Sequence, residues 1–194
     1  MAPGQQVYAL AEDGNSLRQG EIISGLVRGR QALDSFSNEV PEFLFEAHPY
    51  AIILSQDCDL EQDWKRRQEQ GLAEIQAPSL PEILFAQLVT ARELRSKGLT
   101  SEAWRRIKIN KDERYQFLEQ APQESDAQGQ GLPEFGIDFK RYFTIPTAEV
   151  YKQIELDARR RCRLLSPYLE HLSTRFCFYQ FRVALPEDHR SVSD

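Results

Sequence analysis

The sequence has few cysteines and no long apolar run, and both absences narrow the class of protein. Its three cysteines, Cys58, Cys162 and Cys177, stand far apart and form no CxxC pair, which disfavours a disulfide framework and a zinc ribbon. No stretch approaches the roughly 20 apolar residues that cross a bilayer. The first residues lack the basic segment and apolar run of a secretory signal. We therefore expect a cytoplasmic protein with reduced thiols and no membrane partner.

The sequence also lacks the usual motifs of metal and cofactor enzymes. Its three histidines show no HxxxH or HExxH spacing, so a zinc enzyme has no support. It contains no phosphate loop, no GxGxxG and no GxSxG. We expect neither a cofactor nor a resident metal.

The composition is that of a globular protein, with 41% hydrophobic and 28% charged residues in a chain of 194. We predict one domain over residues 20–186, with a flexible lead-in over 1–19 and a tail over 187–194. The segment 119–136 is rich in Gln, Gly and Pro and is expected to be a mobile loop within that domain.

Apolar, β-branched runs at 21–27, 42–47, 50–55, 82–89 and 142–145 predict about five short strands. Strands and helices do not alternate regularly, which disfavours a doubly wound parallel sheet. The order favours an α+β fold, a small and mostly antiparallel β-barrel with peripheral helices.

Capping patterns predict where the helices begin. Thr90 and Glu93 form a capping box for a helix over 91–97, which Gly98 would end. Thr147 similarly opens a short helix. The longest helix would begin at Ser166-Pro167, and its apolar stripe repeats at steps of three and four residues from Leu165 to Val183. That stripe is expected to pack on the barrel.

A dense polar cluster follows the strand at 50–55 and includes Ser55, Gln56, Asp57 and Asp59, which we take as candidate binding residues. In an extended backbone the two aspartates would share a face, where they could hold a divalent metal or transfer protons. The alternative, which we favour, is structural: Asp59 caps a helix through 63–67 and Asp57 bonds its own loop. Cys58, between two carboxylates, is expected to face the core rather than act as a nucleophile.

Basic residues gather toward the end of the chain, where residues 140–182 carry nine Lys and Arg against four Asp and Glu, although the net charge is −6. They could bind phosphate or an acidic partner, or they could pair with the excess carboxylates of the chain. Arg175 and Arg182 lie seven apart on one face of the last helix and are candidate binding residues. Arg28 and Arg30 flank a glycine after the first strand, where an arginine can approach a phosphate.

Three segments, 19–23, 50–55 and 83–90, resemble in order the opening motifs of the PemK/MazF-like barrels. That resemblance implies an SH3-like barrel, a dimer, and a bacterial toxin that cleaves single-stranded RNA without metal and is inhibited by an antitoxin. It would place Arg28 or Arg30 at the family's loop arginine and Thr90 at its catalytic-site threonine. The SQDCDL block at 55–60, with the closing aromatic and arginine residues, is similar to a group of bacterial proteins that share the barrel pattern.

Two functions follow from this resemblance. The favoured one is a non-catalytic barrel module that binds a protein or nucleic-acid partner in a toxin–antitoxin-like or defence-type system. The alternative is a metal-independent endoribonuclease acting on single-stranded RNA, with Arg28, Arg30 and Thr90 at its site. Asp57 and Asp59 place negative charge beside the expected RNA groove, and capping already explains Thr90. Both observations favour the binding module, and either function is compatible with a homodimer.

Overall fold

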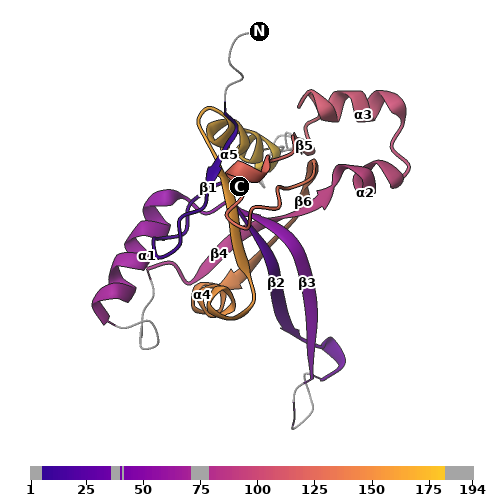
Figure 1. Cartoon of the computed structure of the whole chain (residues 1–194). Helices are drawn as coiled ribbons and strands as arrows, with labels where there is room; N and C mark the ends of the chain where they lie inside the picture. The colour runs from indigo at the N-terminus through magenta and orange to yellow at the C-terminus, as the bar shows by residue number, and fades with distance from the viewer. Residues whose placement is uncertain (1–5, 36–39, 41, 71–78, 182–194) are drawn as a thin grey trace, which may run out of the picture.

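The computed structural model describes residues 6–35, 40, 42–70 and 79–181, and it has an α+β fold (Figure 1). Its strands form one antiparallel sheet and are β1 (Tyr8–Leu10), β2 (Glu21–Gln31), β3 (Phe43–Ile53), β4 (Glu82–Thr90), β5 (Tyr115–Leu118), β6 (Phe135–Pro146) and β7 (Arg159–Leu164). The α-helices are α1 (Asp57–Gln70), α2 (Ala91–Ser96), α3 (Ser101–Lys108), α4 (Thr147–Leu156) and α5 (Tyr168–Gln180). No helix of the described chain is both long enough and apolar enough to cross a bilayer.

The sheet is open rather than closed. Its strand order is β1-β7-β2-β3-β4-β6-β5, and β1 and β5 occupy the two edges without pairing with each other. Register shifts in β2 and β4 add local twist. The prediction of an α+β fold with a mostly antiparallel sheet is confirmed, whereas its closure into an SH3-like barrel is not.

The strand predictions are right for the apolar runs and incomplete elsewhere. The runs at 42–47 and 50–55, predicted as two strands, form the single strand β3. Pro49 lies opposite Gly25, between the registered pairs Ser24–Tyr50 and Leu26–His48, and so the ladder continues past it. Strands β1, β5 and β7 are not among the predicted strands. The last of these is the basic run RRRCRL, which carries no apolar strand pattern.

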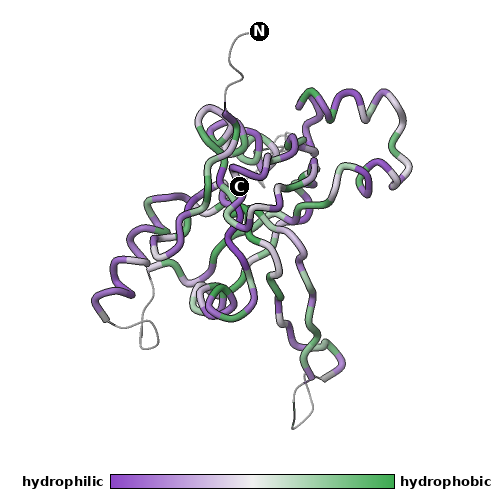
Figure 2. Tube along the Cα trace, viewed as in Figure 1, coloured by the Kyte–Doolittle hydropathy of each residue, from purple (hydrophilic) through white to green (hydrophobic). Residues whose placement is uncertain are grey.

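Two hydrophobic clusters fill the two faces of the sheet. One contains Ile22, Ile52 and Phe139 and receives Leu172 from α5, while Phe176 and Tyr179 pack against it. The other contains Ile23, Ile53 and Phe85 with Leu60 of α1 and Val150 of α4. Neighbouring residues of one strand join different clusters because side chains alternate across a sheet. Hydrophobic colouring follows the central strands and continues into the projecting hairpin of β2 and β3 (Figure 2).

The predicted terminal helix exists, and its apolar stripe packs on the sheet as expected. The helix begins at a different residue from the predicted one. Helix α5 begins at Tyr168, and its N-cap is Pro167, which offers no side-chain hydrogen bond. The predicted N-cap at Ser166 is therefore wrong. Val183 and Arg182 lie outside the described residues, as does the tail predicted over 187–194.

Strand β7, which lies between β1 and β2, contributes a buried ion pair to the sheet. Arg160 Nε donates to Glu21 Oε1 at 2.5 Å and its Nη2 to Glu21 Oε2 at 2.9 Å, and the same guanidinium bonds the carbonyls of Asn15 and Ser16. Together with β1 and the fully buried Leu17, these bonds hold residues 6–19 against the sheet. These residues belong to the segment 1–19 that we predicted to be a flexible lead-in, and they contain strand β1.

The neighbouring Arg161 binds a second buried carboxylate. Its Nε and Nη2 donate to the two oxygens of Asp126 at 2.8 and 2.7 Å. Burial alone would raise the pKa of Asp126, but hydrogen bonds from Arg161 and the amides of Gln128 and Gln130 outweigh burial and lower it. The segment 119–136, which we expected to be a mobile loop, is therefore anchored at its middle.

We expect Arg161→Met to lower the free energy of unfolding by about 3–5 kcal/mol, because it leaves the Asp126 carboxylate buried without a counter-ion. Adding Asp126→Asn to that variant should restore part of the loss. Urea unfolding measures both. Lys152→Met, which breaks an exposed pair with Glu155, is the control and should change stability by less than about 1 kcal/mol. A double variant less stable than Arg161→Met would contradict the uncompensated-charge explanation.

His48 is buried in β3 and stacks on Phe143, with ring centroids 3.7 Å apart. Neither ring nitrogen has a hydrogen-bond partner among the described residues. Burial lowers the pKa of His48; Glu46 opposes the shift and Arg28 adds to it. The imidazole is therefore held neutral in the folded protein.

Because the unfolded chain takes up this proton below its ordinary pKa of about 6.5, the contribution of His48 is complete above that pH and is lost as the pH falls. We expect His48→Phe to keep the stack and to reduce the loss of stability between about pH 6.5 and pH 5. Urea unfolding at both pH values tests this. An unchanged pH dependence would show that His48 is not the group responsible.

Candidate functional site

The predicted polar cluster lies at the junction of β3 and α1, where its side chains are used structurally. Ser55 Oγ accepts a hydrogen bond from the Leu84 amide at 2.9 Å. Asp57 accepts from the guanidinium of Arg18 at 3.1 and 3.2 Å and from the Gln19 amide at 2.7 Å. These bonds join the start of α1 to the segment before β2.

The prediction that Asp59 caps a helix is wrong, because α1 begins two residues earlier at Asp57 and Asp59 lies exposed in its first turn. Ser55, Gln56, Asp57 and Asp59 do line a common cavity of about 590 Å³, together with Cys58 and Cys177. Cys58 is exposed and does not face the core, contrary to expectation. In the part of the chain that the structure describes, no three His, Cys, Asp or Glu side chains are placed to hold a metal ion.

The other sequence-predicted candidates do not converge. Thr90 ends β4 and caps α2, with the complete capping box predicted for it. Arg28 and Arg30 lie in strand β2, opposite Glu46 and Leu44 of β3, rather than in a loop. That part of β2 projects away from the body of the sheet, whereas α2 lies on another side of the molecule (Figure 1).

The guanidinium of Arg175 is engaged within the protein. Its guanidinium donates to the carbonyl of Asn110 at 2.5 Å, to that of Tyr115 at 2.8 Å and to that of Asp112. These bonds attach α5 to the start of β5 and to the segment before it. Arg182, its predicted companion, lies outside the described residues.

Several exposed apolar side chains lie together on the arm, which we define as residues 25–31 of β2 and 43–50 of β3. Pairing of β2 with β7 ends at Ser24, and pairing of β3 with β4 covers only Ala51–Ile53. The arm is therefore a two-stranded ribbon that projects from the sheet (Figure 1). Since opposite residues share a face, one face carries Val27, Gly29, Phe43 and Phe45, and the other carries Arg28, Arg30, Leu44 and Glu46.

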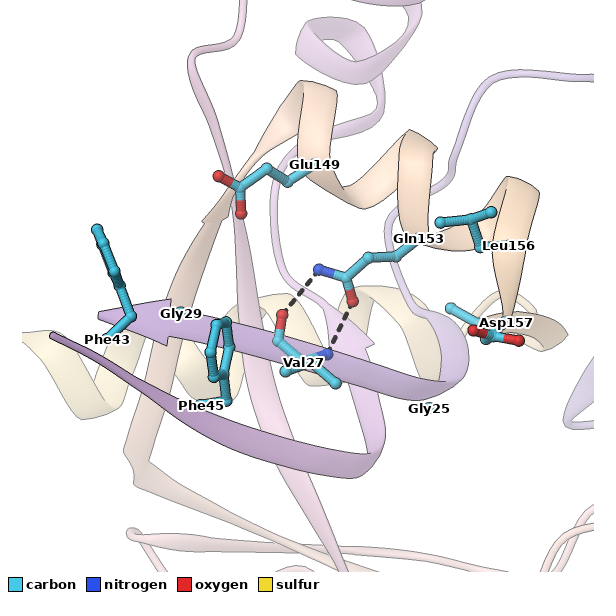
Figure 3. A pocket seen from close by; sticks show the side chains of 10 residues that line it. Gly25, Val27, Gly29, Phe43, Phe45, Glu149, Gln153, Leu156 and Asp157 are labelled. Atoms are coloured by element: carbon cyan, nitrogen blue, oxygen red, sulfur yellow. Dashed lines mark hydrogen bonds between the residues drawn. The ribbon is translucent and has the colours of Figure 1, made fainter. Parts of the chain in front are cut away.

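A groove of about 480 Å³ runs between the apolar face of the arm and α4. Figure 3 shows Val27 and Gly29 on one strand and Phe43 and Phe45 on the next, with α4 alongside. Phe45 is 75% exposed. A large aromatic side chain this exposed, in a groove of this size, is typical of a surface that contacts another molecule. We call this cavity the arm groove.

Gln153 of α4 satisfies the outer edge of β2. Its side-chain Oε1 accepts from the Val27 amide at 2.8 Å, and its Nε2 donates to the Val27 carbonyl at 2.7 Å (Figure 3). A side-chain amide thus makes the two bonds that a residue of a neighbouring strand would make. Beyond this point, none of the described strands pairs along this edge.

The charged side chains that line the arm groove are both acidic. They are Glu149, in the first turn of α4, and Asp157, directly after that helix. The arm groove is not among the sites predicted from the sequence. The alternation of Phe43 and Phe45 along a strand was a visible signal, but it could not show that this strand leaves the sheet and exposes them.

Comparison with protein-family models, curated proteins and solved structures gives no significant match for the chain.

We expect Asp57→Asn to lower the free energy of unfolding by about 1–2 kcal/mol, because it removes the charge that accepts the Arg18 and Gln19 bonds. Asp59→Asn is the matched control on the same helical turn and should change stability by no more than about 0.5 kcal/mol. Thermal melts of both variants test this. Equal effects would show that helix-dipole charge, rather than the Arg18 contact, is what Asp57 contributes.

Proposed function

We propose that the protein is a non-catalytic, cytoplasmic binding module whose arm groove binds a protein partner. The observation that carries this proposal is the exposure of an aromatic strand face beside α4, because soluble proteins rarely leave contiguous apolar surface uncovered without a use for it. Phe43, Phe45, Val27 and Leu156 are all exposed around this groove. Aromatic side chains in a groove are also the usual anchors of protein interfaces.

The charges of the groove support a protein partner over a nucleic acid. Glu149 and Asp157 would repel a phosphate backbone, whereas they would attract lysine or arginine side chains. The partner surface that fits is therefore apolar with basic residues beside it. The resemblance to PemK/MazF-like barrels supports placing such a module in a bacterial toxin–antitoxin-like or defence-type system.

The ribonuclease alternative has less support from the geometry. Its proposed threonine, Thr90, already accepts from and donates to Glu93 in the capping box. Arg28 and Arg30 stand on the arm, away from that threonine. The three residues would not surround one scissile phosphate in this arrangement.

Affinity capture from cells of the natural source tests the binding proposal, using the intact chain as bait. We expect wild type to retain a partner that Phe45→Ser loses. Phe178→Ser is the matched control, because Phe178 on α5 is 71% exposed, close to the 75% of Phe45, and lies outside the arm groove. The captured partner, purified separately, should then bind wild type directly. Equal loss in both variants would contradict a specific arm interface.

Single-stranded RNA provides the opposing test. The binding proposal predicts that the RNA stays intact with and without chelator. Chelator-resistant cleavage that disappears in Arg30→Ala would overturn it in favour of the endoribonuclease.

A further inference from the structure

The edge of β2 in the arm groove has the geometry of a site for one more strand. In an antiparallel ladder, residues whose N–H and C=O groups point away from the partner strand occur at every second position. Val27 is such a residue, since both of its groups bind Gln153 rather than β3. By the same alternation, Gly29 presents its N–H and C=O to this edge.

Gly29 also leaves space at the floor of the groove. A Cβ at this position would lie 3.5 Å from the ring of Phe45, which is ordinary contact distance. The missing side chain therefore opens the face between Phe45 and α4 to a side chain from elsewhere. Main-chain hydrogen bonding and an apolar pocket thus occur together at one residue.

We propose that the arm groove binds an extended segment of the partner as an added strand beside Gly29, continuing the line that the Gln153 amide begins at Val27. An apolar side chain of that segment packs on Phe45, and a lysine or arginine two residues along the segment, on the same face, pairs with Glu149. This inference rests on the proposed function and specifies its ligand. Strand addition of this kind takes affinity from main-chain bonds and specificity from alternate side chains.

The charge of the arm groove and the geometry of its strand edge indicate which kind of ligand fits it. Because the two ionisable side chains of the groove are carboxylates, an acidic segment would be repelled. A helix offers no free main-chain donors along its length, so it could not use the Gly29 edge. An extended apolar and basic segment satisfies both conditions.

A displayed library of random nine-residue peptides, selected on the full chain, is the probe. We expect the enriched peptides to carry a β-branched or aromatic residue and a lysine or arginine two positions apart, because residues at every second position of a strand share a face. The best of them, made synthetically, should bind Gly29→Val at least tenfold more weakly by calorimetry, because the new side chain fills the floor. Valine favours strands, so the melting temperature of this variant should not fall.

Two further measurements distinguish the contribution of the Glu149 charge to peptide binding from that of the main-chain hydrogen bonds at Gly29. Glu149→Lys should lose the basic peptide, whereas Glu170→Lys, on the exposed first turn of α5, should bind it as wild type does. A peptide carrying one N-methyl group at the residue facing Gly29 should lose binding, because it can no longer donate there.

Each other outcome overturns the inference. Peptides that bind Gly29→Val as well as wild type, or a selection that enriches acidic peptides or none, would do so. A homodimer in light scattering that Gly29→Val abolishes would identify a second copy as the occupant. If Phe45→Ser loses the cellular partner while Gly29→Val retains it, the arm binds its partner without strand addition, and only the proposed function stands.

Discussion

The fold depends on two adjacent arginines buried on strand β7. Consecutive strand residues point to opposite faces, so Arg160 and Arg161 enter different sides of the sheet, where each is nearly fully buried and paired with a buried carboxylate. Glu21 and Asp126 come from segments far away in the sequence. A charge in this position is tolerated only with its partner in place, and so these pairs fix where the start of β2 and the segment before β6 must lie.

The arm exists because β7 pairs with only the first part of β2. Pairing of β7 with β2 runs only from Glu21 to Ser24, and it includes a register shift beside Ile23. The chain reaches β7 from α4, which lies against the next part of β2 through Gln153. Since α4 occupies the place where β7 would have continued, the edge of β2 is covered by a side-chain amide instead of a strand. Gln153 therefore protects the edge of β2 at Val27 only.

The sequence predicted the apolar strands and the capping-box helix because both have local causes. β4 and the helix after Thr90 follow from runs and caps that a few residues define. The site could not be predicted in this way. Arg160 and Arg161 resemble a basic surface patch in the sequence, and only their pairing with Glu21 and Asp126, more than 30 residues away along the chain, shows that they are buried.

The arm could not be predicted from the sequence for the same reason. The local residue pattern suggests that its aromatic side chains are buried, whereas the tertiary structure exposes them. Phe43 and Phe45 alternate with Leu44 and Glu46 as they would in a half-buried strand, so a sequence-based argument places them in the core. Their exposure follows from the short pairing of β3 with β4, which covers three residues only. Side chains that have a core pattern but no core to cover them leave apolar area in water that a further surface could bury. A strand from a partner, held at Gly29 and attracted by Glu149, would provide that surface without any change in the sheet that carries the arm.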